Sequence, residues 1–226
     1  MGKNKLQRFA ETTTFKNFVQ PEKYFFTEDF YFKGNWCSNF FKNNNALYLE
    51  LGCGKGEYTV GLARIHPYNN YLGVDIKGAR MWRGAKTALN ENIENAGFLR
   101  IRINQISRFF AKGEVNGIWI TFPDPQPKQA KAGKRLTSPE FLEEYKKFLK
   151  PGAIIHLKTD NLPLFDYTLE IIEQHHHKLL MKTYDLYSES IDNEAKNIQT
   201  FYEKMFLAED KKICYLQFCL SPDEKK

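Results

Sequence analysis

Short apolar runs alternate with longer segments of helical periodicity from Ala46 onward. Short runs of aliphatic, β-branched and aromatic residues bounded by Gly, Pro or Asn predict strands, whereas apolar positions three and four apart predict helices. We expect strands at 46–51, 71–75, 99–103, 117–122, 153–158, 179–184 and 213–220. Helices are expected between them, at 57–66, 77–94, 138–150, 163–174 and 199–208. Alternation of this kind is typical of βαβ units and a parallel sheet.

The order of elements predicts an α/β fold, Rossmann-like, with helices on both faces of a mostly parallel seven-stranded sheet and an antiparallel C-terminal strand. A length of 226 residues suits one such domain. We assign residues 46–226 to it. Residues 1–45 are rich in aromatic side chains but lack a clear period, and they are expected to form an arm packed on the domain or preceding it.

Charge and composition narrow the class of partner. The net charge of +6 favours an acidic partner, although ordinary surface charge is the alternative. No apolar run approaches the roughly 18–20 residues of a membrane span, and no secretory signal is evident, so a cytoplasmic protein without membrane contact is expected. The four cysteines form no CxxC pair, and the three consecutive histidines at 175–177 fit a polar helix end better than a metal site. No metal is expected.

A glycine-rich turn joins the first expected strand to the first expected helix. Its sequence, ELGCGKG at 50–56, lets the backbone turn sharply and approach a ligand at the carboxyl edge of the sheet. A dinucleotide fingerprint would need glycine where Glu57 stands, and a P-loop would need Ser or Thr after Gly-Lys. A carboxylate at Glu50 would repel a pyrophosphate and attract a cationic ligand. The alternative is a tight turn of purely structural importance.

Polar residues end the next two expected strands. Asp75 lies about 20 residues beyond the glycine turn, where an acidic residue accepts hydrogen bonds from both ribose hydroxyls. Asn104 follows the third expected strand and is positioned to meet an adenine edge. Either residue could instead cap the following helix. Together with Glu50, these positions predict a site for S-adenosylmethionine (SAM), whose sulfonium and amino groups are cationic.

A proline-rich, basic loop follows the fourth expected strand. Three prolines between 123 and 127 stiffen it and would hold Asp124 at the mouth of the cofactor site. Four cations and no anion follow, namely Lys128, Lys131, Lys134 and Arg135. A solvated loop is the alternative, but the position at the binding edge of the sheet favours phosphate contacts.

Six short motifs lie within roughly residues 46–208, namely ELGCGKG at 50–56, GVD at 73–75, FPDPQPK at 122–128, KRLT at 134–137, HLKTDN at 156–161 and TFYE at 200–203. In these motifs the chain resembles the tRNA (guanine-N7-)-methyltransferase family. The glycine motif is generic to SAM enzymes, whereas the DPxPK loop, the KTDN strand end and the TxYE element, in that order, are much more specific. The resemblance implies a SAM-dependent methyltransferase fold and methyl transfer to N7 of a guanine in the variable loop of tRNA. The products would be 7-methylguanosine and S-adenosylhomocysteine.

Site residues follow from the resemblance position by position. It implies that SAM is bound by the glycine turn and the acidic strand ends, at Glu50, Gly52, Gly54, Asp75, Asn104 and Asp124. It implies substrate contacts at Lys128, Asp160, Thr200, Tyr202 and Glu203, to which we add Arg135 as a phosphate contact, and it gives Asp124 the catalytic role. The chain departs from the family pattern at Gln126, where Trp is usual, at Asn104, where Asp is common, and at Asp75, where Glu is common.

Guanine N7 carries a free lone pair at neutral pH, so no proton has to be removed before it attacks. Positioning of the reactants would then be the main contribution to catalysis. The hypothesis is that Asp124 holds the guanine while Asp160 and Glu203 shape the far wall. Two other functions stay open at this point: a SAM-dependent methyltransferase of a small molecule, and a non-catalytic RNA-binding relative. The first would need an apolar, covered pocket, and the second should have lost the acidic strand ends. For a tRNA enzyme, a monomer and a homodimer are both compatible with the sequence.

Overall fold

In the computed structural model, which describes residues 2–21, 30–190 and 194–222, eight strands form one sheet. They are β1 (Phe18–Val19), β2 (Ala46–Leu51), β3 (Asn69–Asp75), β4 (Ala96–Arg100), β5 (Val115–Thr121), β6 (Leu149–Thr159), β7 (Lys178–Thr183) and β8 (Cys214–Cys219). The order across the sheet is β1-β4-β3-β2-β5-β6-β8-β7. The first six strands in this order, from β1 across to β6, pair with their neighbours in parallel. Strand β8 lies between β6 and β7 and is antiparallel to both. The predicted mostly parallel sheet is confirmed, and β1 adds a short strand that the sequence pattern did not predict.

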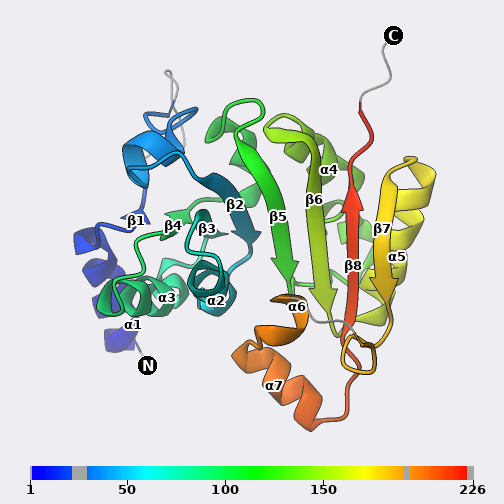
Figure 1. Cartoon of the computed structure of the whole chain (residues 1–226). Helices are drawn as coiled ribbons and strands as arrows, with labels where there is room; N and C mark the ends of the chain where they lie inside the picture. Colours follow the sequence, from blue (N-terminus) through cyan, green and yellow to red (C-terminus); the bar gives the residue numbers. More distant parts are fainter. Residues whose placement is uncertain (1, 22–29, 191–193, 223–226) are drawn as a thin grey trace.

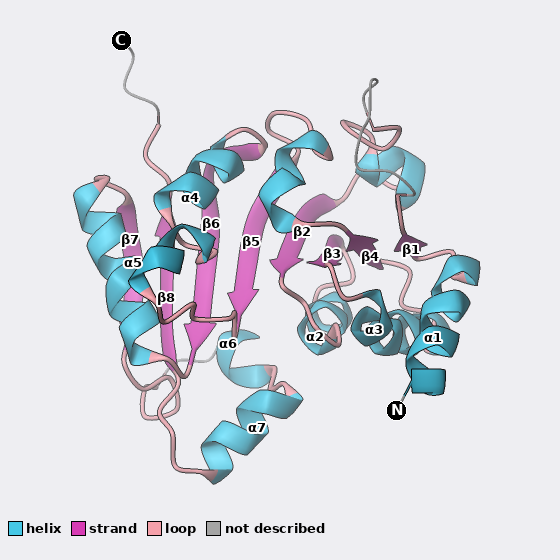
Figure 2. Cartoon of the chain, turned by 180° about the vertical axis from the view of Figure 1, so that it is seen from behind, coloured by secondary structure: helices cyan, strands magenta, loops and turns pink. Residues whose placement is uncertain are grey.

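Helices cover both faces of the sheet (Figures 1 and 2). They are α1 (Gly2–Glu11), α2 (Glu57–Ile65), α3 (Gly78–Asn90), α4 (Pro139–Lys146), α5 (Leu162–Gln174), α6 (Glu194–Asn197) and α7 (Phe201–Ala208). Shorter helical turns are η1 (Thr12–Thr14), η2 (Trp36–Phe40), η3 (Ile103–Arg108) and η4 (Gln129–Lys134). Figure 1 shows α6 and α7, in orange, beyond the arrowhead ends of β5 and β6. None of the helices in these ranges combines the length and apolar character needed to cross a membrane.

Two clusters of buried side chains pack against the sheet. Alternate residues of a strand face opposite sides, so Leu47, Leu49 and Leu51 of β2 join one cluster, which also contains apolar residues of α4 and α5. The other cluster combines Trp119 of β5 with Tyr58 of α2 and residues of α3 and α6. Both faces of the central strands are therefore buried, as a parallel sheet requires.

The described part of the N-terminal segment packs on this sheet. Trp36 is fully buried and donates from Nε1 to the carbonyl of Phe109 at 2.8 Å. Helix α1 lies along α3, where the Glu11 carboxylate accepts from Trp82 Nε1 at 2.8 Å and pairs with Lys86. Residue 1 and residues 22–29 of the proposed arm lie outside the described ranges.

The boundary between α3 and β4 differs from the predicted one. We expected a helix to residue 94 and a strand from residue 99, but α3 ends at Asn90 and β4 begins at Ala96. Asn92 adopts a left-handed φ of 55°, which reverses the chain, and Asn95 donates from its amide to the carbonyls of Ala63, His66 and Asn69. As a result, Asn104 lies in η3 rather than directly at a strand end.

Candidate active site

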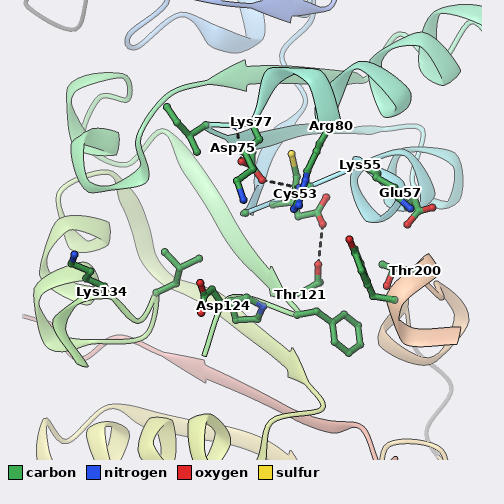
Figure 3. A pocket seen from close by; sticks show the side chains of 18 residues that line it. Cys53, Lys55, Glu57, Asp75, Lys77, Arg80, Thr121, Asp124, Lys134 and Thr200 are labelled. Atoms are coloured by element: carbon green, nitrogen blue, oxygen red, sulfur yellow. Dashed lines mark hydrogen bonds between the residues drawn. The ribbon is translucent and has the colours of Figure 1, made fainter. Parts of the chain in front are cut away.

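A cavity of about 320 Å³ opens at the carboxyl edge of the central strands (Figure 3). This volume lies within the range of small-molecule sites, roughly 300–1,000 Å³. Its lining comes from the glycine turn, the β3–α3 turn, the loop after β5 and the start of α7: Glu50, Gly52, Cys53, Gly54, Lys55, Glu57, Asp75, Ile76, Lys77, Arg80, Thr121, Phe122, Pro123, Asp124, Lys134, Leu136, Thr200 and Tyr202. Figure 3 shows Asp75, Lys77 and Arg80 across the cavity from Asp124 and Lys134.

The glycine turn forms the floor of the cavity. Gly52 and Gly54 have φ angles of +74° and +54°, in the left-handed region that side chains disfavour. The Gly52 N–H donates to the carbonyl of Val74 at 2.8 Å, which ties the turn to the neighbouring strand β3. The turn can therefore present main-chain groups to a ligand without side chains in the way.

Glu50 lies at the end of β2 and is only 3% exposed, although it still lines the cavity. One carboxylate oxygen accepts from the Thr59 N–H at 2.8 Å and from the Thr59 hydroxyl, and the other accepts from the Thr121 hydroxyl at 2.9 Å. Burial raises the pKa of this carboxyl from 4.5 to about 7, with hydrogen bonds from the two threonines opposing the rise. A cation in the cavity would favour the ionised form of Glu50.

Asp75 ends β3 and is fixed by the backbone on both sides. One oxygen accepts from the Gly54 N–H at 3.0 Å, and the other accepts from the Lys77 N–H at 2.8 Å. A carboxylate has about four acceptor positions, so each oxygen keeps a lone pair for the cavity. The side chain is thus held in place and can still accept from two ligand hydroxyls.

The loop after β5 carries Asp124 on a constrained backbone. Phe122 and Gln126, two positions before and after Asp124, have left-handed φ angles of 47° and 46°, which are uncommon for residues with side chains. The Phe122 N–H donates to the carbonyl of Lys158 at 2.8 Å, and the Gln126 N–H donates to Asp124 Oδ1 at 3.1 Å. Strained backbone of this kind is concentrated at functional sites, where it aims a side chain.

The buried side chain of Arg135 supports this loop. It is 8% exposed, donates to the Gln126 carbonyl at 3.3 and 3.4 Å, and places its guanidinium 4.2 Å from the ring centre of Tyr167. The phosphate contact that we predicted for Arg135 needs an exposed guanidinium. The structure instead uses this side chain to hold the loop.

The start of α7 closes another side of the cavity. Thr200 caps this helix in a capping box with Glu203, and Tyr202 is 44% exposed and lines the cavity. The glycine turn contacts the same helix, because the Phe201 N–H donates to Glu57 at 2.9 Å and Lys55 Nζ lies 3.7 Å from the centre of the Phe201 ring. The sequence TFYE therefore presents its threonine and tyrosine to the cavity.

Glu203 points the other way. It has no exposed surface, and its carboxylate pairs with the equally buried Lys158 of β6 at 2.6 Å. It also accepts from the Tyr187 hydroxyl at 2.7 Å and from the Thr200 N–H at 3.3 Å. Its carboxylate is therefore occupied by partners within the protein rather than directed at the cavity.

The structure brings seven of the predicted site residues together around the cavity: Glu50, Gly52, Gly54, Asp75, Asp124, Thr200 and Tyr202. The other five predicted residues, Asn104, Lys128, Arg135, Asp160 and Glu203, do not line it. Asn104 and Lys128 are exposed, and Asp160 is half-buried at the end of β6.

Sequence reasoning missed Thr121 and the pair Lys77 and Arg80. Thr121 directly precedes the FPDP motif at the end of β5, and that position next to β2 is the signal that it can contact Glu50. Lys77 and Arg80 flank the start of α3, and their spacing of three residues places them on one face. Both residues follow Asp75 closely along the chain, so the sequence could have assigned them to the same cofactor-binding edge of the sheet.

The donors and acceptors of the cavity fit SAM. A buried carboxylate at Glu50 suits a cationic group, Asp75 suits ribose hydroxyls, and the glycine turn leaves room for close backbone approach. Among the residues that the structure describes, no group of three or more His, Cys, Asp or Glu side chains could hold a metal ion.

Solved methyltransferases share this fold. The 16S rRNA methyltransferase KamB has a TM-score of 0.61 at 16% sequence identity, covering 79% of this chain and 89% of that one. A 16S rRNA (adenine(1408)-N(1))-methyltransferase from Catenulisporales acidiphilia, solved with SAM as cosubstrate, has a TM-score of 0.53 at 12% identity, covering 82% and 91%. The chain therefore has the fold of SAM-dependent methyltransferases.

Sequence comparison narrows the class. A family model described as "Putative methyltransferase" matches residues 44–216. The tRNA (guanine-N(7)-)-methyltransferase of Christiangramia forsetii is 50% identical over 219 residues, which cover 96% of this chain and 98% of that protein. The chain belongs to the tRNA (guanine-N7-)-methyltransferase family.

Proposed function

We propose that this protein transfers the methyl group of SAM to N7 of a guanine in tRNA, with Asp124 as the residue that faces the reacting base. One observation carries the proposal: the generic cofactor motif and the family-specific motifs FPDPQPK and TFYE line the same cavity. An open, basic edge at Lys134 and Arg80 fits a nucleic-acid substrate better than a covered small-molecule pocket would.

SAM supplies an electrophilic methyl group from its sulfonium centre. Guanine N7 has a free lone pair, so no residue has to remove a proton before attack, and the residues of the cavity act by positioning and by charge. Asp75 and the glycine turn orient the cofactor, while the buried carboxylate of Glu50 provides the negative charge near its cationic groups.

Asp124 faces the base. Its second oxygen, Oδ2, is free of the Gln126 contact and accepts hydrogen bonds from the N1–H and N2–H₂ edge of guanine. Positive charge appears on the purine as N7 is methylated, and an adjacent carboxylate stabilises that charge most in the transition state. Tyr202, which is 44% exposed and lines the same cavity, offers a ring surface for the extruded base, which the Gln126 position lacks.

The first experiment is methyl transfer from radiolabelled SAM to an unmodified tRNA transcript, with the product nucleoside identified by mass spectrometry. We expect 7-methylguanosine. SAM binding without methylation of any tRNA would overturn the proposal and favour a small-molecule substrate.

The role of Asp124 is tested by Asp124→Asn, which keeps the shape and removes the charge. We expect kcat to fall by roughly 10²–10³-fold, the loss typical of one electrostatic contact to the transition state. The matched control is Asp160→Asn, the same change at a carboxylate outside the cavity lining, which we expect to lower kcat much less. Turnover near wild type in Asp124→Asn would contradict the assignment.

A further inference from the structure

A second hollow, of about 790 Å³, lies between α1 and the β3–α3 turn. Its lining contains no acidic side chain and five cationic ones, Lys5, Arg8, Lys77, Arg80 and Arg100. We call this hollow the α1 groove. A cluster of like charges in one concave surface raises the local concentration of anions.

The cations of the α1 groove keep their charge free for a partner. Within the described ranges, none of the five forms an ion pair with a carboxylate. Two are held instead by neutral groups: Arg8 lies 4.9 Å from the centre of the Trp82 ring, and Arg100 donates to the Ile76 carbonyl at 3.1 Å. Lys86, further along α3, differs from these five cations because it forms an ion pair with Glu11.

The α1 groove adjoins the cofactor cavity. Ile76, Lys77 and Arg80 line both hollows, so the positive surface continues from α1 to the edge of the active site. Lys134 of the basic loop lies on the far side of the same cavity, opposite Arg80 (Figure 3). Cations therefore stand on both sides of the opening through which a base must enter.

We propose that the α1 groove binds backbone phosphates of the tRNA on one side of the target guanine, while the basic loop after β5 binds the other side. Enzymes that take a base out of its stack also contact the nucleotides that flank it on either side. The five cations come from α1, the β3–α3 turn and the end of β4, and such a spread matches a chain of phosphates better than one small anion. This inference rests on the proposed tRNA methylation.

The test uses the full chain with Lys5→Gln and Arg8→Gln together. Both residues are exposed and line the α1 groove but not the cofactor cavity. Each lost phosphate contact reduces the slope of log affinity against log salt by about 0.7–0.9. The ratio of wild-type to variant tRNA affinity should therefore fall roughly tenfold between 50 and 200 mM salt. We expect a higher KM for tRNA, with kcat and SAM affinity unchanged.

The matched control is Lys112→Gln with Lys150→Gln. These two exposed lysines line a different hollow, which contains no residue of α1 or α3, and their loss changes the net charge by the same amount. If both double variants have the wild-type salt slope, or if both reduce it equally, the α1 groove is not a specific RNA contact. Wild-type activity on tRNA is measured in parallel, so a failure of the proposed function would appear there first.

Discussion

Glu50 links the chemistry of the cofactor site to pH. Burial raises the pKa of its carboxyl to about 7, and the neighbouring Asp75 carboxylate acts in the same direction. Because this pKa lies above the ordinary value of 4.5, the folded protein holds the proton more tightly than the unfolded chain does. The cofactor-free protein therefore loses stability as the pH rises from 4.5 to 7, by about 3 kcal/mol from this group.

The same group affects SAM binding in the opposite direction, since we expect SAM affinity to increase as the pH rises. Only ionised Glu50 attracts the cationic ligand, so we expect SAM affinity to fall roughly tenfold between pH 8 and pH 6, as the ionised fraction falls. Calorimetric titration across this range measures the effect. Glu50→Gln stays neutral and still reports any titration of the ligand itself. An equally steep profile in Glu50→Gln would show that Glu50 is not the titrating group.

Residue types and their order predicted the acidic strand ends well, but not which charges face inward. Glu50 and Asp75 lie in the last residues of β2 and β3, and Asp124 follows β5. The topology of a parallel sheet brings such positions together. Glu203 was expected to contact the substrate because it belongs to a family motif, and Arg135 because it belongs to the basic loop. Whether a charge faces a cavity or a buried partner depends on long-range packing, which spacing along the chain does not report.

At the scale of elements, a buried ion pair between Lys158 and Glu203 helps to fix the position of α7. Lys158 lies in β6, and burial lowers the pKa of its ammonium group while the charge of Glu203 opposes this shift. Its Nζ also donates to the carbonyls of Ala195 and Ile198, just before α7. The KTDN strand end and the TFYE helix are thus bound together, and the pair holds Thr200 and Tyr202 at the cavity.

Lys158→Met should destabilise the protein by about 3–5 kcal/mol, because it leaves the Glu203 carboxylate buried without a counter-charge. Urea denaturation measures this loss. Adding Glu203→Gln removes the stranded charge, so the double variant should recover part of the stability. We expect the double variant to keep SAM affinity and to show a raised KM for tRNA, since α7 carries substrate-side residues. A double variant less stable than Lys158→Met would exclude the ion pair as the cause.

Element boundaries show where sequence patterns stop being informative. Strand β2 and helix α2 were predicted within one residue, because the glycine turn marks the junction between them. The end of α3 was placed four residues too late, and the next strand begins earlier than predicted. Gly97 lies within β4, where a Cβ would come within 2.5 Å of the Phe40 ring. That contact joins residues 57 positions apart, and no local pattern contains it.

At the scale of the whole molecule, the N-terminal segment completes one face of the sheet. Trp36 is fully buried among Phe30, Phe40 and Phe110, and residues of β2, β5 and β6 belong to the same cluster. The Glu114 carboxylate, next to β5, accepts from the backbone N–H groups of Gly34 and Trp36 at 2.8 and 3.1 Å. The segment therefore contributes to the same folding unit as the sheet.

This arrangement predicts the cost of removing the Trp36 side chain. Trp36→Ala should lower the free energy of unfolding by about 3–5 kcal/mol, the range for deleting a buried aromatic ring. Such a loss is a large fraction of the roughly 5–15 kcal/mol that stabilises a typical domain.

The matched control is Trp82→Ala. Trp82 is half-buried between α1 and α3, so removing its side chain should destabilise the protein less. Urea unfolding followed by circular dichroism compares the two, and an equal or smaller cost at Trp36 would show that the segment is an appendage. Because Trp36 does not line the cofactor cavity, the folded fraction of Trp36→Ala should bind SAM with wild-type affinity.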